Sequence, residues 1–205
     1  MATKYGFSDI REALVEDLKG AYPTKWENFG AARILGEDVF GSPKPHPNAV
    51  LNLFLEQDVK FALPFAAYRA TTGGIPDLVS DKPGTVLPRL TLASIIHGMG
   101  AMKRAIILSV YAIVHVGDLG VCPDRSCVLN IGINSTAARR GALNKIFNVM
   151  VKGGEANVLS PPSFGGIVCT SCARELEKAY LDRCKEFVWA VLPSLFGWGS
   201  WQEFA

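Results

Sequence analysis

Two close pairs of cysteines, far apart in the chain, constrain this sequence more than any of its other features. The first pair is Cys122 and Cys127, in GVCPDRSC, and the second is Cys169 and Cys172, in IVCTSC. Two residues separate the second pair, a spacing that lets both sulfurs face one ion without backbone strain, and four residues separate the first pair, a looser spacing. Four thiolates can form the tetrahedron of a structural zinc site. The spacing therefore predicts that these four cysteines bind one Zn²⁺ ion and join a loop to a distant helix.

Two other interpretations of the cysteines stay open at this point. Free cysteine is among the most buried residue types, so all four could be ordinary core thiols. Cys169 and Cys172 could instead form a thioredoxin-like redox pair, but the βαβ context of that motif is not evident in the sequence. A site closed by four protein ligands has no open position for an activated water, which argues against a metalloenzyme.

Composition and charge exclude several classes of protein. The chain has 205 residues, of which 49% are hydrophobic and 20% charged, as in a globular protein large enough for a core. Its net charge of +2 gives no electrostatic case for nucleic acid or an acidic membrane.

No secretory signal opens the sequence, and Lys103 and Arg104 interrupt its longest apolar segment. We therefore expect a cytoplasmic or nuclear protein with no membrane span, whose thiols stay reduced.

The N-terminal residues 8–20 have the apolar spacing of a helix. Ile10, Leu14 and Leu18 recur at every fourth position, Ser8 can cap the start, and Gly20 ends the pattern. The spacing predicts that these three side chains face a core. On that basis Leu14→Ala should cost roughly 2–5 kcal/mol.

The rest of the first half also shows helical patterns. A proline-rich turn at 41–48 is followed by predicted helices at 48–57 and 60–71, the second opened or kinked near Pro64. A loop is expected over 72–89. The apolar stretch 90–117 predicts a long helix that breaks near the glycines of HGMG.

The second half has two further helical patterns. Residues 136–151 place Ala138, Ala142, Ile146 and Val149 at helical spacing, and a final helix runs from Cys169 to about Leu192. The inward stripe of that final helix is predicted to comprise Leu176, Tyr180, Cys184, Phe187 and Val191. An aromatic C-terminal tail is expected to fold back over the core. The sequence thus predicts an all-α, irregular helical domain, a single unit over 1–205 with segments 1–89 and 90–205.

No catalytic arrangement is evident elsewhere in the sequence. The histidines are His46 in the proline-rich turn, expected to be exposed and inert, and His97 and His115, expected to be core residues. None has the spacing of a catalytic zinc site, and the glycines of TTGG and SFGGI lack a phosphate-loop frame. We therefore expect a protein that is not an enzyme.

Several stretches resemble one protein family. ATKYGFSDIREALVEDLKGAYPTKWENF, HPNAVLNLFLEQDVKFALPFAAYRA and VWAVLPSLFGW, together with the late C-x2-C, are similar to the region that follows the BTB/POZ domain in agaricomycete (mushroom) BTB proteins. The BTB fold itself does not fit before residue 5. The chain therefore looks like the post-BTB helical region alone, as a fragment or a short gene product.

The resemblance implies a non-enzymatic, adaptor-like domain that binds other proteins. Without the BTB module, a link to cullin-type ligases and BTB-type dimerisation are both in doubt, and self-association by another surface stays open. The alternative is a zinc-dependent nucleic-acid-binding module that would use Arg125, Arg139, Arg140 and Lys145. The near-neutral charge makes nucleic acid the less favoured partner.

Overall fold

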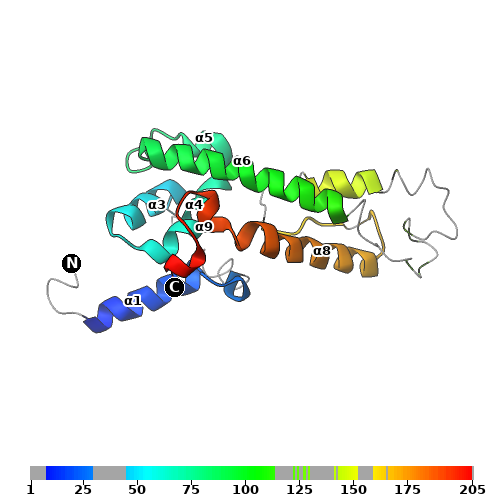
Figure 1. The fold of residues 1–205 in the computed structure, drawn as a ribbon, viewed down its shortest axis with the longest axis horizontal. Coiled ribbons are helices and arrows are strands. Elements are labelled where there is room, and N and C mark those ends of the chain that lie inside the picture. Colours follow the sequence, from blue (N-terminus) through cyan, green and yellow to red (C-terminus); the bar gives the residue numbers. More distant parts are fainter. Residues whose placement is uncertain are drawn as a thin grey trace. The chain divides into compact units, whose positions relative to one another are not determined.

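The described part of the chain is entirely helical. The computed structural model describes residues 8–29, 45–113, 122, 124, 127, 129, 141, 143–151, 159–164 and 166–204. No strand occurs among these residues (Figure 1). The prediction of an all-α fold is confirmed.

Two compact units divide the chain. One comprises Met1–Met99 together with Leu192–Ala205, and the other is Gly100–Val191. The C-terminal segment therefore belongs to the same unit as the N-terminal half. That the whole chain forms a single globular unit stays a prediction. No helix in the described ranges is both long and apolar enough to cross a membrane.

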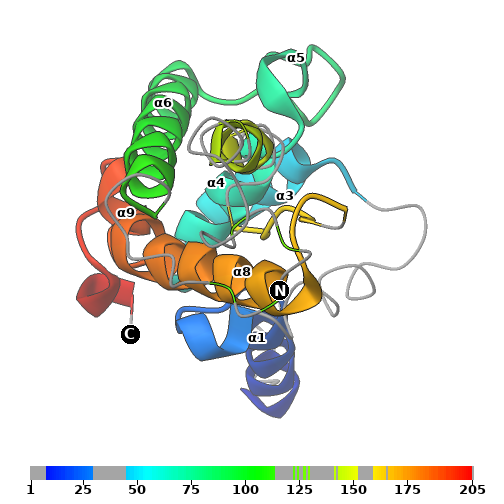
Figure 2. The same ribbon diagram turned by 90° about the vertical axis from the view of Figure 1, so that its right-hand side faces the viewer.

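The first unit is built from short helices. They are α1 (Ser8–Ala21), η2 (Trp26–Asn28), α3 (Pro47–Glu56), η3 (Lys60–Ala62), α4 (Leu63–Thr71), α5 (Gly74–Leu78), α9 (Leu192–Leu195) and η6 (Trp201–Phe204). Helix α4 lies beside α3 and α9 (Figure 1, Figure 2). Its residues are buried almost throughout, as expected for the central element of a small core.

Aromatic side chains hold these helices together. Tyr22 meets Phe54 edge-on with ring centroids 4.8 Å apart, and it meets Phe65 in the same way at 6.0 Å. The expected fold-back of the C-terminal tail is also present, since Leu192 and Phe196 are buried. Edge-to-face packing of this kind adds to the free energy gained by burying the rings.

The helices predicted at 48–57 and 60–71 are confirmed as α3 and as η3 followed by α4. Pro64 lies in the first turn of α4, where its missing N–H is not needed. His46, expected to be exposed and inert, is half-buried, and its Nδ1 accepts a hydrogen bond from the Asn48 backbone N–H at 3.3 Å. That expectation was wrong because the proline-rich turn places His46 at the N-cap of α3.

A buried asparagine organises the segment that was expected to be a plain loop. Part of 72–89 forms α5, and Asn48 is almost fully buried against it. The Asn48 Nδ2 donates to the backbone carbonyls of Asp77, Leu78 and Thr85 at 3.0, 3.2 and 3.1 Å. One side chain of α3 thus satisfies carbonyls of a segment far along the chain.

Asn48→Ala is expected to destabilise the protein by about 1–3 kcal/mol, because it leaves buried carbonyls without a donor. Asn52→Ala is the matched control, since Asn52 lies one turn on and bonds the carbonyls of Gly84 and Val86 at an exposed position. Water can replace those bonds, so the control should lose less stability. Urea unfolding of both variants measures the difference, and equal losses would contradict the role given to Asn48.

Helix α1 begins at Ser8 as predicted, but its apolar side chains do not face a core along their whole length. Leu14 is 55% exposed and Leu18 is half-buried, whereas Ala21 and Tyr22 at the end of the helix are buried. The first turns of α1 project from the first unit (Figure 1, Figure 2). The prediction that Leu14 faces inward was wrong, because only the last turn of the helix meets a packing surface.

Leu14→Ala is accordingly expected to change the free energy of unfolding by no more than about half a kcal/mol, the usual range for surface positions. Phe54→Ala, which truncates a buried ring, should instead cost about 3–5 kcal/mol. Denaturant unfolding of the two variants checks this contrast. A loss of several kcal/mol for Leu14→Ala would show that the helix is buried in solution.

Helix α6 (Arg89–Tyr111) runs without interruption through the HGMG stretch (Figure 1). The break expected there was wrong. A Cβ atom on Gly98 would lie 2.5 Å from Phe196 Cδ1 and 2.7 Å from the Leu195 carbonyl oxygen. Glycine at this position therefore serves close packing of the C-terminal segment against α6, and it does not end the helix.

Gly98→Ala is expected to destabilise the protein by about 1–3 kcal/mol, as overpacked sites do, because a backbone carbonyl blocks the new methyl group. Gly100→Ala is the matched control on the same helix. Its Cβ would come no nearer than 3.5 Å to the flexible end of Arg104, so alanine should stabilise the helix by about 0.5–1 kcal/mol. The denaturation midpoint should fall for Gly98→Ala and rise for Gly100→Ala, relative to the wild type. A higher midpoint for Gly98→Ala would contradict the packing role given to Gly98.

The second unit contains the later part of α6, a helix over 143–151 and α8 (Thr170–Cys184). Ile146 and Met150 of the 143–151 helix are fully buried, and Val149 is half-buried. The predicted helix is confirmed over these residues, while Ala138 and Ala142 lie outside the described ones. The buried residues of this unit include two of the cysteines singled out above, Cys122 and Cys127.

Helix α8 passes into a π-helical turn, η5 (Lys185–Trp189). The Ala190 backbone N–H donates to the Lys185 carbonyl at 3.0 Å, a bond that spans five residues where an α-helix spans four. One extra residue is thereby inserted into the turn.

The π turn shifts the inward face of the helix by one position. Leu176, Tyr180 and Cys184 are buried as predicted. Phe187 and Val191 are exposed, and Val188 and Leu192 are buried in their place. The second part of the predicted stripe was wrong because it assumed an unbroken α-helical period.

Candidate metal centre

The second cysteine pair lies at the start of α8. Cys169 occupies the N-cap with extended backbone (φ −66°, ψ 162°), and Cys172 is the third residue of the helix. The Ala173 N–H donates to the Cys169 carbonyl at 2.9 Å and closes the first turn. Helix N-termini carry free N–H groups and a positive dipole end, both of which favour thiolate charge.

The segment before α8 fixes where this helix begins. Phe164 is fully buried, and the Ile167 N–H donates to its carbonyl at 3.1 Å. Gly166 within this turn has φ +76°, a left-handed conformation that side chains with a Cβ rarely adopt. The buried Phe164 ring and the turn at Gly166 together position Cys169 at the N-cap of α8.

The first cysteine pair comes from a turn in which Cys122, Asp124 and Cys127 are described. The Cys127 backbone N–H donates to the Asp124 carbonyl at 3.1 Å. Cys122 and Cys127 are each only 3% exposed, whereas Cys169 and Cys172 are half-buried. The loop thus supplies the two sheltered sulfurs and the helix supplies the two accessible ones.

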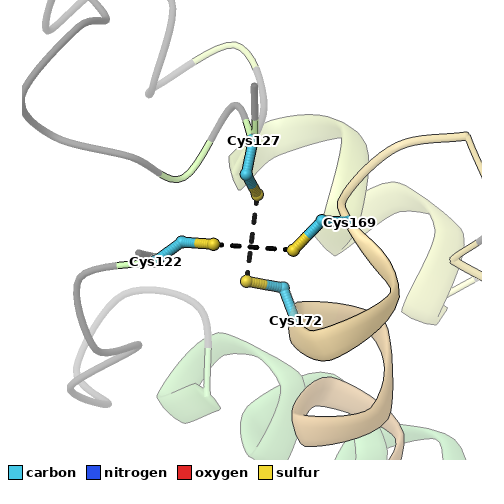
Figure 3. A group of neighbouring side chains, drawn as sticks. All are labelled: Cys122, Cys127, Cys169 and Cys172. Carbon is cyan, nitrogen blue, oxygen red and sulfur yellow. Dashed lines mark hydrogen bonds between the residues drawn. The ribbon is translucent and has the colours of Figure 1, made fainter. Parts of the chain in front are cut away.

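The four sulfurs converge on one point. The Cys122 and Cys169 Sγ atoms are 3.5 Å apart, those of Cys127 and Cys172 are 3.8 Å apart, and all four lie within 4.8 Å of one another. Figure 3 shows the side chains directed at a common centre, two from the loop and two from the helix. All five cysteines are free thiols. The arrangement could hold a metal ion, as the spacing predicted, and bound metal itself stays a prediction.

The backbone at the helix start favours thiolate at one of these positions. The pKa of Cys169 is lowered to about 7, mainly by the backbone N–H of Cys172 and further by hydrogen bonds with the neighbouring thiols. Burial is the main cause that raises the pKa of Cys172, and hydrogen bonds with the neighbouring thiols raise it further. Burial also raises the pKa of Cys122, partly offset by the Asp124 backbone N–H. Without a cation, the cluster therefore holds few negative charges.

The fifth cysteine is separate from this cluster. Cys184 is fully buried on α8, and burial raises the pKa of its thiol to about 12. It is the inert core thiol that the sequence predicted.

The other candidate residues form no second site among the described residues. Within those residues, no further group of three or more metal-ligating side chains comes together. His97, expected to be a core residue, is exposed on α6, so that expectation was wrong. Lys145 is exposed, whereas His115, Arg125, Arg139 and Arg140 lie outside the described residues.

Comparison of the chain with protein-family models, with curated proteins and with solved structures finds no match. The resemblance to agaricomycete BTB proteins therefore stays a prediction.

Proposed function

We propose that the chain is a non-enzymatic protein-interaction domain whose second unit is held together by a structural zinc ion. The observation that carries the proposal is the convergence of four thiols on one point. Four sulfurs placed about 2.3 Å from zinc in a regular tetrahedron lie about 3.8 Å from one another. The separations of 3.5 and 3.8 Å are close to that geometry, and the other pairs, which lie within 4.8 Å, would close by at most about 1 Å.

The donor set supports a structural role for the ion. Soft thiolate ligands favour zinc over magnesium or calcium, and four cysteines fill every position of a tetrahedral site. No place remains for a water or a substrate. The ion would join the 122–127 turn to the start of α8, which are distant in sequence, and so would restrict the unfolded chain more than a local crosslink does.

Exposed apolar side chains support the interaction role. Leu90 is 83% exposed and Val86 62% exposed, and Ile75 and Val79 on the same segment are each more than half exposed. Leu53 on α3 is a further exposed apolar side chain of the same unit. Exposed apolar groupings are typical of protein-binding surfaces. The resemblance to post-BTB regions points to the same role.

The test compares the protein partners of matched variants. Leu90→Asp and Arg89→Asp both place an acid in the exposed first turn of α6, but only the first removes an apolar side chain. Quantitative mass spectrometry of proteins captured from the source cells should show partners that the wild type and Arg89→Asp retain and Leu90→Asp loses. Identical partner profiles for the two variants would contradict a role of the 75–90 segment in binding proteins.

A second arm tests the competing function. Fluorescence titration with duplex DNA and single-stranded RNA at several salt concentrations should show weak binding, in keeping with a net charge of +2. Tight binding that falls steeply with salt would replace the interaction proposal with a nucleic-acid-binding one.

A further inference from the structure

The four-cysteine cluster pairs each loop sulfur with a helix sulfur. Cys122 lies 3.5 Å from Cys169, and Cys127 lies 3.8 Å from Cys172. Each close pair therefore bridges the turn and the helix, so a bond within either pair would join the two segments (Figure 3).

The helix sulfurs and the loop sulfurs also differ in burial, and this difference decides which of them reacts first with an oxidant. Cys169 and Cys172 are half-buried, whereas Cys122 and Cys127 are almost fully buried. A dissolved oxidant therefore meets the helix sulfurs first. Oxidation of cysteine proceeds through a sulfenic acid, which condenses with an adjacent thiol to give a disulfide.

We propose that hydrogen peroxide converts the zinc crosslink into a covalent one, forming the disulfides Cys122–Cys169 and Cys127–Cys172 and releasing the ion. The inference rests on the zinc site proposed above. The turn stays attached to α8 in both redox states, first through the metal and then through the two disulfides. The site would thus release zinc without releasing the loop.

The reaction balances in two steps for each pair. A helix thiolate attacks one oxygen of the peroxide, the O–O bond breaks, and the sulfenic acid forms with that oxygen and its own hydrogen. The hydroxide that leaves takes up one proton and becomes water. The partner sulfur then attacks the sulfenic sulfur, the S–S bond forms, and a second water leaves. Four thiolates, two molecules of peroxide and four protons give two disulfides, four waters and free Zn²⁺. The thiolates are oxidised by four electrons and the peroxide is reduced by four.

The main competing outcome of the oxidation is that the cysteines pair within each segment. A disulfide within each sequence-local pair, Cys122–Cys127 and Cys169–Cys172, would consume the same peroxide and release the same ion. It would leave the turn and the helix unconnected. The pairing of the sulfurs therefore separates the proposal from ordinary loss of a metal site.

Tryptic mapping after treatment of the purified protein with peroxide and then a thiol-blocking reagent distinguishes the two outcomes. Trypsin cuts after Arg104, Arg125, Arg139, Lys152 and Arg174, so Cys122 and Cys127 fall in separate peptides, 105–125 and 126–139. Cys169 and Cys172 share the peptide 153–174. The proposal predicts one assembly of all three peptides, with fragmentation between the last two cysteines assigning each bond. An internal disulfide in 153–174, with 105–125 linked to 126–139, would overturn it, and so would the third possible pairing, Cys122–Cys172 with Cys127–Cys169.

Two further measurements complete the test. Metal analysis before oxidation tests the zinc site by itself: a chain without metal would refute the zinc proposal, while the peptide map would still decide the pairing. With zinc present, a chromogenic chelator should record release of nearly all of the ion as the disulfides form. The oxidised, zinc-free protein should unfold at a higher temperature than reduced protein stripped by chelator, and equal temperatures would contradict a retained crosslink.

Discussion

Cys172→Ser is expected to lower bound zinc from about one ion per chain to nearly none, because a structural site needs all four ligands. Loss of the ion should also destabilise the second unit, since the binding free energy of structural zinc contributes directly to folding. Elemental analysis of freshly purified, unoxidised protein measures the first effect. Thermal unfolding with and without chelator measures the second.

Cys184→Ser provides the control for this experiment. Cys184 lies on the same helix but outside the cluster, in the core. Its substitution should cost some stability and leave the zinc content unchanged. Equal metal contents for Cys172→Ser and Cys184→Ser, or wild-type protein without stoichiometric metal, would show that the four thiols are ordinary core residues.

Zinc affinity is expected to fall by at least about 100-fold for each unit that the pH drops below 8, because binding must displace protons from the thiols. The pKa of Cys122 and that of Cys172 are raised by burial, so in the metal-free protein both groups are protonated at neutral pH. Each of these two protons contributes a factor of ten per pH unit. The stabilisation by zinc is therefore present at high pH and is lost as the pH falls.

The slope should steepen below pH 7. Cys169 has a pKa of about 7, so its thiol must also lose a proton on binding once the pH is lower than that. Competition titrations with a chromogenic chelator between pH 6 and 8 measure the curve, and Cys184→Ser should follow it unchanged. An affinity that is independent of pH in this range would rule out thiolate ligation.

Much of this structure could be predicted from local patterns in the sequence. Apolar periodicity located α3, α8 and the helix over 143–151, because each buries one face and therefore repeats its apolar residues at the helical period. Helix α4 was located by its nearly continuous apolar sequence, in keeping with its burial almost throughout. The candidate metal site was predicted from two cysteine spacings alone. Those spacings are informative because tetrahedral thiolate coordination restricts how close two ligands can lie along a chain.

The errors arose where tertiary packing decided the outcome. Gly98 is a weak helix former in isolation, but its missing side chain makes room for Leu195 and Phe196. The π turn at Lys185–Trp189 changes the period within one helix, and Leu14 follows a helical pattern that meets no surface. The contact at Gly98 joins residues almost a hundred positions apart, so local patterns could not reveal it.

The membership of Leu192–Ala205 in the first unit has a consequence for how the protein is made. Residues of the first unit are synthesised both before and after the whole of the second unit. The second unit can fold while the first still lacks Leu192 and Phe196, which are buried in its finished form. Because domains fold as units during synthesis, the N-terminal helices must wait for Leu192–Ala205 before their core can be completed.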